Sequence, residues 1–441
     1  MTALPTTDTL LSALRPHPQP RHLYIGYSGG IDSHVLLHLA ATSPLKEHVT
    51  AVYVHHGLQA VADAWAVHCS AVAHSLGVKC VVLYVNAQPT PGESPEEAAR
   101  NARYAAFKAL LEQDDMLMLA QHREDQLETV LLQLLRGSGV KGLSAMPTHS
   151  VCGAGLLLRP LLDTAKAAID AYAQLHALTW VTDPTNLCDD YDRNFLRNRV
   201  VPLLKQRWPQ CDKTVARSAK HCAEADHLLA SMAGQLLQPL YDATDQTLRI
   251  SLLQTYDAPQ QALVIRHWLS TLGVKMPPQG LIDRIAAEVL AARPDGSPVL
   301  ATTSYALRRY KDKLYCLPVA KERIQAMAWP NAQTSIALSA HRQLARIDAS
   351  SGIAVAHWQQ AQVTIRPRSG GEKIRLPQRL GHHSLKKLFQ EADIPPWERE
   401  VMPLVYLDGD LAAVGDVWVS ADFYSVGGAC IRLSISRAAY S

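Results

Sequence analysis

The stretch Tyr24-Ile-Gly-Tyr-Ser28-Gly29-Gly30-Ile31-Asp32-Ser33 decides the fold of this 441-residue chain. It follows an apolar run that predicts a strand and opens the apolar pattern of a helix at residues 32–41. The two glycines let the backbone turn tightly and approach an anion. Backbone amides at the start of the helix then point at that anion, and the helix dipole favours its negative charge. The stretch therefore predicts a phosphate-binding turn, to which the hydroxyls of Ser28 and Ser33 add donors.

Asp32 is the unexpected residue in this turn, because a carboxylate beside phosphates repels them. One interpretation is a helix cap, a position where Asp is common. The other is a ligand of a magnesium ion, which bridges to the phosphates and reverses the local sign of the charge. The Gly-Lys-Ser/Thr ending of a Walker loop is missing, so another type of nucleotide site is indicated.

The first half of the chain alternates apolar runs with helical patterns, which is typical of a parallel sheet covered by helices on both faces. We therefore expect an α/β, doubly wound first domain. From residue 189 the pattern becomes helical, and residues 363–433 predict a compact mixed α/β unit. The predicted strands are residues 22–27, 49–54, 78–85 and 116–120, and the predicted helices are residues 62–76, 95–112, 125–135, 191–207 and 214–237.

Composition limits the class of protein. With 48% hydrophobic and 19% charged residues the chain is globular, and its length predicts roughly two to four domains. There is no signal-peptide pattern and no run of about 18 apolar residues, so we expect a cytoplasmic protein. The eight cysteines show no paired spacing for zinc or redox chemistry. Since the formal charge is only +3, a nucleic-acid partner needs local basic patches.

Three further stretches narrow the function. The first two lie at the carboxyl ends of predicted strands, beside the crevice that binds ligands in such sheets, and the third lies on the helix predicted at residues 191–207. Each also has an ordinary structural interpretation: a buried histidine pair, an acidic first turn favoured by the helix dipole, or an amphipathic helix with surface arginines. In the second stretch Asp125 and Glu128 share one helical face, and in the third Asn194 and Arg197 do. The stretches are Val54-His-His-Gly-Leu58, Gln121-His-Arg-Glu-Asp-Gln-Leu-Glu-Thr129 and Tyr191-Asp-Arg-Asn-Phe-Leu-Arg-Asn-Arg199.

Together these blocks resemble the bacterial tRNA(Ile)-lysidine synthetase family of PP-loop ATP pyrophosphatases. Ser28 to Ser33 is similar to the Ser-Gly-Gly-x-Asp-Ser signature of that superfamily. The resemblance covers nearly the whole chain and extends to Arg100-Asn-Ala-Arg103-Tyr104, Leu385-Lys-Lys-Leu388 and Ile394-Pro-Pro-Trp397. One position departs from the family pattern, since Glu124 stands where an aspartate is usual.

The resemblance implies an ATP-dependent ligase with ATP, Mg²⁺, free L-lysine and the tRNA(Ile) with a CAU anticodon as cofactors and partners. It adenylates O2 of the wobble cytidine and then joins lysine to C2, giving lysidine. Implied domains are a PP-loop ATP-binding domain at residues 1–215, a helical linker with a small substrate-binding domain at 216–340, and a C-terminal tRNA-binding domain at 341–441.

The resemblance also implies roles for single residues. Asp32 and Asp125 are expected to hold metal and, with Arg100 and Arg197, to act in catalysis, and Arg103 is a further candidate on the α-phosphate. ATP is expected at Ser28, Gly29, Gly30, Ile31, Asp32 and Ser33, and lysine at Asp125, Glu128 and Asn194.

A cluster of cations between residues 363 and 390 suits RNA phosphates, although an ordinary basic surface has the same composition. The candidates for tRNA binding are Arg366, Arg368, Lys373, Arg375, Lys386 and Lys387. Alternatives to the ligase are a PP-loop tRNA thiolation enzyme, which commonly carries paired cysteines, an amidotransferase-linked synthetase, and a non-catalytic tRNA-binding protein. The general base stays open, as does the choice between a monomer and a homodimer.

Overall fold

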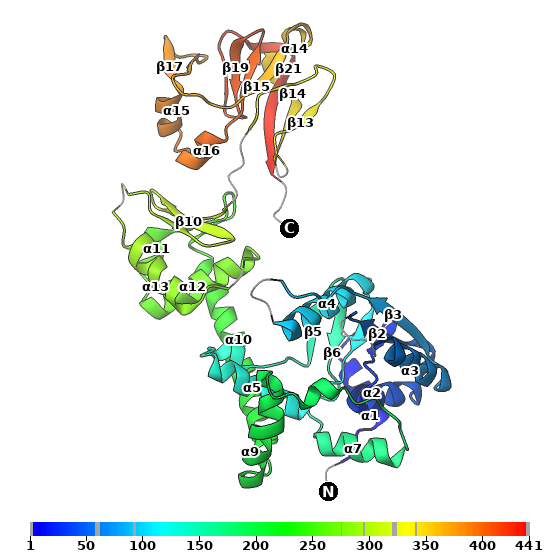
Figure 1. Cartoon of the computed structure of the whole chain (residues 1–441). Coiled ribbons are helices and arrows are strands. Elements are labelled where there is room, and N and C mark those ends of the chain that lie inside the picture. Colours follow the sequence, from blue (N-terminus) through cyan, green and yellow to red (C-terminus); the bar gives the residue numbers. More distant parts are fainter. Residues whose placement is uncertain are drawn as a thin grey trace. The chain divides into compact units, whose positions relative to one another are not determined.

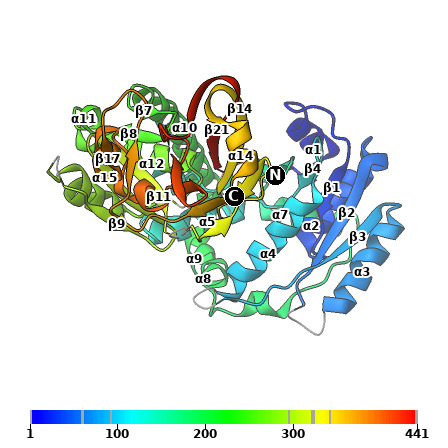
Figure 2. The same cartoon turned by 90° about the horizontal axis from the view of Figure 1, so that it is seen from above.

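The computed structural model describes residues 3–57, 62–90, 94–274, 276–293, 296–319, 324–339 and 342–437. Leu58, the last residue of the histidine block, lies outside this part of the chain. The chain forms two compact units, Met1–Met232 and Ala233–Ser441 (Figures 1 and 2). Each unit is described by itself.

The first unit is built on a six-stranded sheet with the order β3-β2-β1-β4-β6-β5. Five strands are parallel, and β5 pairs with β6 in the antiparallel sense. The four predicted strands are confirmed, whereas the β5–β6 hairpin at the edge had no counterpart in the prediction. The strands are β1 (Leu23–Gly26), β2 (Val49–His55), β3 (Lys79–Tyr84), β4 (Met116–Met118), β5 (His149–Cys152) and β6 (Gly155–Leu158).

Both faces of this sheet are buried, as the apolar composition of its strands predicts. Side chains alternate between two cores: Leu23 and Ile25 enter one cluster, whereas Tyr24 packs against the other. The first cluster includes residues of α1, α2, α3 and α7, and the second is filled by Phe107 of α4. This confirms the doubly wound arrangement. The helices are α1 (Thr7–Leu14), α2 (Ile31–Ala41), α3 (Ala62–Ser75), α4 (Pro95–Leu110), α5 (Arg123–Leu135), α6 (Val140–Leu143) and α7 (Lys166–Leu175).

The helix predicted at residues 191–207 is interrupted. It consists of α8 (Asp192–Phe195), a π-helical turn at Leu196–Val200 and α9 (Val201–Arg207). Single π turns are frequent at functional sites, where they re-aim side chains. The following α10 (Cys211–Leu237) is one continuous helix, so the proposed domain boundary at 215 falls inside it.

The second unit contains more sheet than the sequence indicated. Its first part packs three helices against a five-stranded antiparallel sheet, with Trp268 fully buried between them. These elements are β7 (Tyr241–Asp242), β8 (Thr247–Arg249), α11 (Ile250–Leu253), α12 (Ala258–Thr271), α13 (Gln279–Arg284), a π turn (Ile285–Leu290), β9 (Val299–Ala301), β10 (Tyr305–Tyr310) and β11 (Lys313–Pro318).

The second part of this unit is the predicted mixed α/β tail, with a second five-stranded sheet beside the long β14–β21 pair. The elements are β12 (Met327–Ala328), β13 (Ser335–Ala337), β14 (Arg342–Ala354), α14 (Val355–Gln360), β15 (Val363–Arg366), β16 (Lys373–Arg375), β17 (His382–Ser384), α15 (Leu385–Glu391), α16 (Pro396–Glu400), β18 (Leu404–Leu407), β19 (Asp410–Val414), β20 (Trp418–Val419) and β21 (Tyr424–Arg437). Among the described residues, no helix has both the length and the apolar character needed to cross a bilayer.

Candidate active site

The turn between β1 and α2 has the backbone that the glycine pair predicts. Gly29 has a φ of +83°, and a Cβ atom there would meet the Val181 side chain at 2.8 Å. A side chain at this position is therefore excluded both by conformation and by space. The carbonyl of Gly29 accepts a hydrogen bond of 3.0 Å from the amide of Val181, which ties the turn to the segment after α7.

The hydroxyl groups of this turn are bonded to one another. Ser33 Oγ accepts from the Ser28 amide at 3.2 Å and donates to the Gly30 carbonyl at 2.9 Å. The two hydroxyls lie 3.1 Å apart. Gly30 is the N-cap of α2, and no side chain caps the helix, so the cap interpretation of Asp32 is wrong. Asp32 instead lines the cavity beside the turn, with 32% of its side chain exposed.

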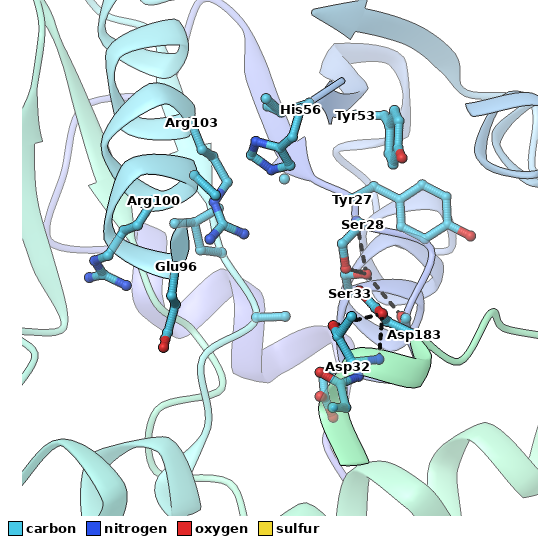
Figure 3. Close-up of a pocket in the computed structure, with 18 of the residues that line it drawn as sticks. Tyr27, Ser28, Asp32, Ser33, Tyr53, His56, Glu96, Arg100, Arg103 and Asp183 are labelled. Atoms are coloured by element: carbon cyan, nitrogen blue, oxygen red, sulfur yellow. Dashed lines mark hydrogen bonds between the residues drawn. The ribbon is translucent and has the colours of Figure 1, made fainter. Parts of the chain in front are cut away.

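A cavity of about 600 Å³ lies at the carboxyl ends of β1, β2 and β4 (Figure 3). This is where a doubly wound sheet is expected to bind its ligand. The cavity brings together residues of five separate sequence blocks. Of the predicted site residues its lining includes Ser28, Gly30, Asp32, Ser33, Arg100, Asp125, Asn194 and Arg197, together with Arg103.

Two acids of α5 are bound by two arginines, one in α8 and one in the π turn. Asp125 accepts hydrogen bonds from Arg193 at 3.2 Å and from Arg197 at 3.0 Å. Glu128, only 1% exposed, accepts from the Nε atoms of the same arginines at 2.9 and 2.7 Å. Such charge-assisted hydrogen bonds are stronger than neutral ones, and they hold both acids against the two arginines. Burial alone raises the pKa of Asp125, but His122 and the two arginines outweigh it and leave this pKa lowered.

His122 connects these acids to the phosphate-binding turn. Its Nε2 atom lies 3.5 Å from an oxygen of Asp125 and 3.7 Å from an oxygen of Asp32. Burial lowers the pKa of His122, yet the surrounding acids, with Glu124 as the largest opposing influence, leave it raised. Both predicted metal ligands therefore have a carboxylate oxygen within 3.7 Å of one ring nitrogen.

Glu124, the residue that departs from the family pattern, is bound on three sides. It accepts from Lys205 Nζ at 2.5 Å and from the Lys166 amide at 2.8 Å, and His122 Nδ1 lies 3.5 Å away. Burial raises its pKa, but these contacts outweigh burial and lower the pKa to about 2. Glu124 does not line the cavity and acts here as an anchor between α5, α7 and α9.

Two arginines of α4 line the cavity, and Arg103 points toward it (Figure 3). The Arg100 guanidinium stacks over the Tyr104 ring, 4.9 Å from its centroid. The Nε atom of Arg103 is buried and has no hydrogen-bond partner among the described residues. Burial lowers the pKa of the nearby His56 to about 4, and the charge of Arg103 acts in the same direction. His56 is therefore neutral near pH 7.

Comparison with known proteins supports one family. The chain is 41% identical to a tRNA(Ile)-lysidine synthase from Methylococcus capsulatus over 94% of its own length and 95% of the relative. It is 38% identical to one from Alkalilimnicola ehrlichii, over 93% of this chain and 95% of the relative. The chain belongs to the tRNA(Ile)-lysidine synthase family.

Three family models match along the chain: a PP-loop domain at residues 5–204, a TilS substrate binding domain at 248–315 and a TilS substrate C-terminal domain at 363–435. A solved U34-tRNA thiolase from Methanococcus maripaludis is similar over 49% of this chain and 77% of its own, with 16% identity and a TM-score of 0.41. Members of the tRNA(Ile)-lysidine synthase family are carbon–nitrogen ligases that modify tRNA, and this chain is one of them.

The site in this lysidine synthase contains contacts that the sequence reasoning missed. Lys166 lies 3.0 Å from Asp32 and also bonds to Asp170. Asn194 donates to the carbonyls of Thr185 and Cys188 at 2.9 and 3.0 Å. Its role in lysine binding thus remains a prediction, beside an observed role in holding residues 183–190. Arg193, which binds Asp125 and Glu128 together with Arg197, was not predicted. Its position four residues before Arg197, on the same helical face, was the signal that could have identified it.

The predicted tRNA-binding cations of the second unit differ in how far they are neutralised. Arg368 lies 3.5 Å from Glu372, Arg375 bonds to Asp422, and Lys387 lies 3.9 Å from Glu391. Arg366 stacks over the Tyr406 ring at 4.5 Å. Within the described residues, Lys373 and Lys386 are exposed and have no ion-pair partner. These two are the cations most free to meet a phosphate.

Proposed function

We propose that this chain joins free lysine to C2 of the wobble cytidine in the minor isoleucine tRNA with a CAU anticodon. The observation that carries the proposal is that one cavity is lined both by the phosphate-binding turn and by Asp125, which Arg193 and Arg197 hold in place. An ATP site alone would not need buried acids, and an amino-acid site alone would not need the glycine turn.

The chemistry takes two steps. Cytosine O2 attacks the α-phosphorus of ATP, pyrophosphate leaves, and the oxygen becomes part of an adenylate. The lysine ε-amine then attacks C2, the C2–O2 bond breaks, and AMP leaves with the oxygen. A free ε-ammonium has a pKa of about 10.4, so it loses a proton before the attack.

The amides and hydroxyls of Ser28 to Ser33 receive the phosphates in this proposal. Arg103 points from α4 toward the cavity and Arg100 lines its edge, and in this proposal their charge stabilises the α-phosphate during transfer. Arg197 binds Asp125, the proposed lysine-binding acid, and also lines the cavity that contains the phosphate-binding turn.

Asp125 receives the lysine substrate, with Glu128 and Asn194 as supports. The lowered pKa of Asp125 makes it a weak base. That fits a carboxylate that attracts the ammonium group by charge better than one that removes its proton. Glu128 keeps Arg193 and Arg197 in place. Asn194 holds the segment at 183–190, which lines the cavity.

Magnesium fits the carboxylates of this cavity. Asp32 and Asp125 supply hard oxygen donors, and Mg²⁺ is commonly held by one or two carboxylates plus substrate phosphates. No cluster of three or more His, Cys, Asp or Glu side chains in the described ranges forms a metal cage. A magnesium ion held there would supply charge neutralisation at the nucleotide phosphates. Lys166 already neutralises Asp32 without it.

The tRNA presents its wobble base flipped out of the loop stack, as base-modifying enzymes require. The exposed cations of the second unit, Lys373 and Lys386 first among them, bind phosphates elsewhere on the RNA. The reaction takes place in the cytoplasm, where tRNA, ATP and free lysine are all present.

Incubation of the purified chain with that tRNA, ATP, Mg²⁺ and radioactive lysine tests the function. The expected result is label in acid-precipitable RNA with one AMP and one pyrophosphate per lysine. A transcript with the wobble cytidine changed to uridine is the control. Label in the control, sulfur incorporation in place of lysine, or RNA binding without AMP would each reject the proposal.

A further inference from the structure

A stripe of three cations runs along the first half of α10. Lys213, Arg217 and Lys220 are exposed and spaced four and three residues apart, so they share one helical face. Within the described part of the chain, none of the three has an ion-pair or side-chain hydrogen-bond partner. The α10 stripe, as we call this set, ends at Glu224, which pairs with His221.

The acid closest in sequence does not neutralise the stripe. Asp212 is buried and bonds to Arg123 Nε at 2.7 Å. The stripe therefore carries three uncompensated positive charges, whereas three of the six cations predicted to bind tRNA in the second unit face a carboxylate. A phosphate that meets the stripe displaces only water and counterions.

The same Arg123–Asp212 pair places the stripe close to the active site. Arg123 begins α5, the helix that carries Asp125 and Glu128, and both partners of the pair are largely buried. Cys211 of α10 also packs against Leu127 of α5. The first turns of α10 are thus fixed to the helix whose acids line or support the cavity.

We infer that the α10 stripe binds the sugar–phosphate backbone of the anticodon stem, the RNA next to the base that enters the cavity. This inference rests on the proposed function. At about 1.5 Å per residue the stripe spans about 10 Å, which corresponds to about three steps between phosphates of a duplex strand at about 3.4 Å of axial rise per step. Lysine and arginine contacts of this kind set the position of an RNA without reading its sequence.

The test is the triple variant Lys213→Glu/Arg217→Glu/Lys220→Glu, assayed for binding to the full-length tRNA and to an isolated anticodon stem–loop over a series of salt concentrations. Each lost phosphate contact lowers the slope of log affinity against log salt by about 1, so we expect a decrease of about 2 to 3. Affinity at low salt should fall at least about tenfold for both RNAs.

Two matched variants control for charge and for fold. Arg15→Glu/Lys46→Glu/Lys79→Glu makes the same charge change at exposed positions that precede β1 and β2 or begin β3, at the sheet end opposite the cavity. Lys213→Arg/Lys220→Arg keeps the charge and should bind as the wild type does. KM for ATP should stay unchanged in all three variants.

Wild-type binding by the stripe variant, an equal loss in the Arg15/Lys46/Lys79 variant, or a loss confined to full-length tRNA would each overturn the inference. In these cases lysine incorporation by the wild type leaves the proposed function standing. If instead the wild type binds RNA through the stripe but incorporates no lysine, the proposed function fails and the stripe remains an RNA-binding surface.

Discussion

The Nε2 atom of His122 lies 3.7 Å from a carboxylate oxygen of Asp32. His122 therefore lies close to acids in the first turns of two helices, Asp32 of α2 and Asp125 of α5, and the charge of each acid acts on it. Replacing Asp32 by Asn removes a charge that both the nucleotide's cation and His122 face. We expect pyrophosphate release to fall by about 100-fold or more, a loss typical of removing one preorganised charged group.

The matched control for Asp32→Asn is Asp170→Asn. Asp170 bonds to the same Lys166 but does not line the cavity. Near-normal pyrophosphate release in Asp32→Asn would remove Asp32 from the catalytic set.

Shortening Glu124 tests whether its extra methylene group is structurally required. Glu124→Asp retains the charge but cannot reach Lys205, the Lys166 amide and His122 at once. Leaving one of these groups without its partner costs about 1–3 kcal/mol of unfolding free energy. Denaturant unfolding of wild type and variant measures the difference. An unchanged midpoint would show that an aspartate fits this site equally well.

The two asparagines around the π turn should behave as a pair. Asn198 donates to the Asn186 carbonyl and to Asp189, so it holds the same segment as Asn194. We expect Asn194→Ala and Asn198→Ala each to raise KM for lysine by about tenfold, the equivalent of about 1.4 kcal/mol or one hydrogen bond. An effect in Asn194→Ala alone would favour direct contact between Asn194 and lysine.

His56 should make the protein less stable in acid. Its folded-state pKa of about 4 lies below the ordinary value of 6.5, chiefly because of burial. Between these values the unfolded chain binds a proton that the folded chain excludes, so stability falls as pH drops from about 6.5 to about 4. In His56→Gln this loss should be smaller, measured as the unfolding midpoint over that pH range. His74→Gln, at an exposed position, is the control and should follow the wild type.

Unpaired cations of the second unit should contribute more to tRNA binding than paired ones. Lys373→Ala/Lys386→Ala removes two exposed charges without an ion partner, and the salt slope of tRNA binding should fall by about 2. Arg375→Ala removes a charge that Asp422 already neutralises, so its effect should be smaller. Equal effects per residue would mean that the Arg375–Asp422 pair opens on binding.

The sequence predicted the parallel strands and the phosphate turn because both are local signals. Apolar runs such as β2 and the glycine pair at 29–30 need no distant partner to be recognised. The β5–β6 hairpin was missed because β5, with the sequence His-Ser-Val-Cys, is not an apolar run and no helix separates the two strands. The contacts of Glu128 and Glu124 were missed because Arg193, Arg197 and Lys205 lie 65 to 81 positions away.

The π turn at Leu196–Val200 was also not predicted. We attribute it to side chains of this helix that bind two different parts of the chain. Arg193 and Arg197 must reach α5 while Asn194 and Asn198 reach the segment at 183–190. Intrinsic helix preference does not report such a demand.

That π turn also bears on the length of this helix. A π turn holds one residue more than the α-helical turn that it replaces, so deleting one residue between 196 and 200 would restore regular winding and leave α9 nearly in phase. Arg197 and Asn198, which lie in the turn itself, would instead move relative to Asp125 and to the Asn186 carbonyl. The extra residue therefore serves the side chains of the turn and not the direction of the helices that follow.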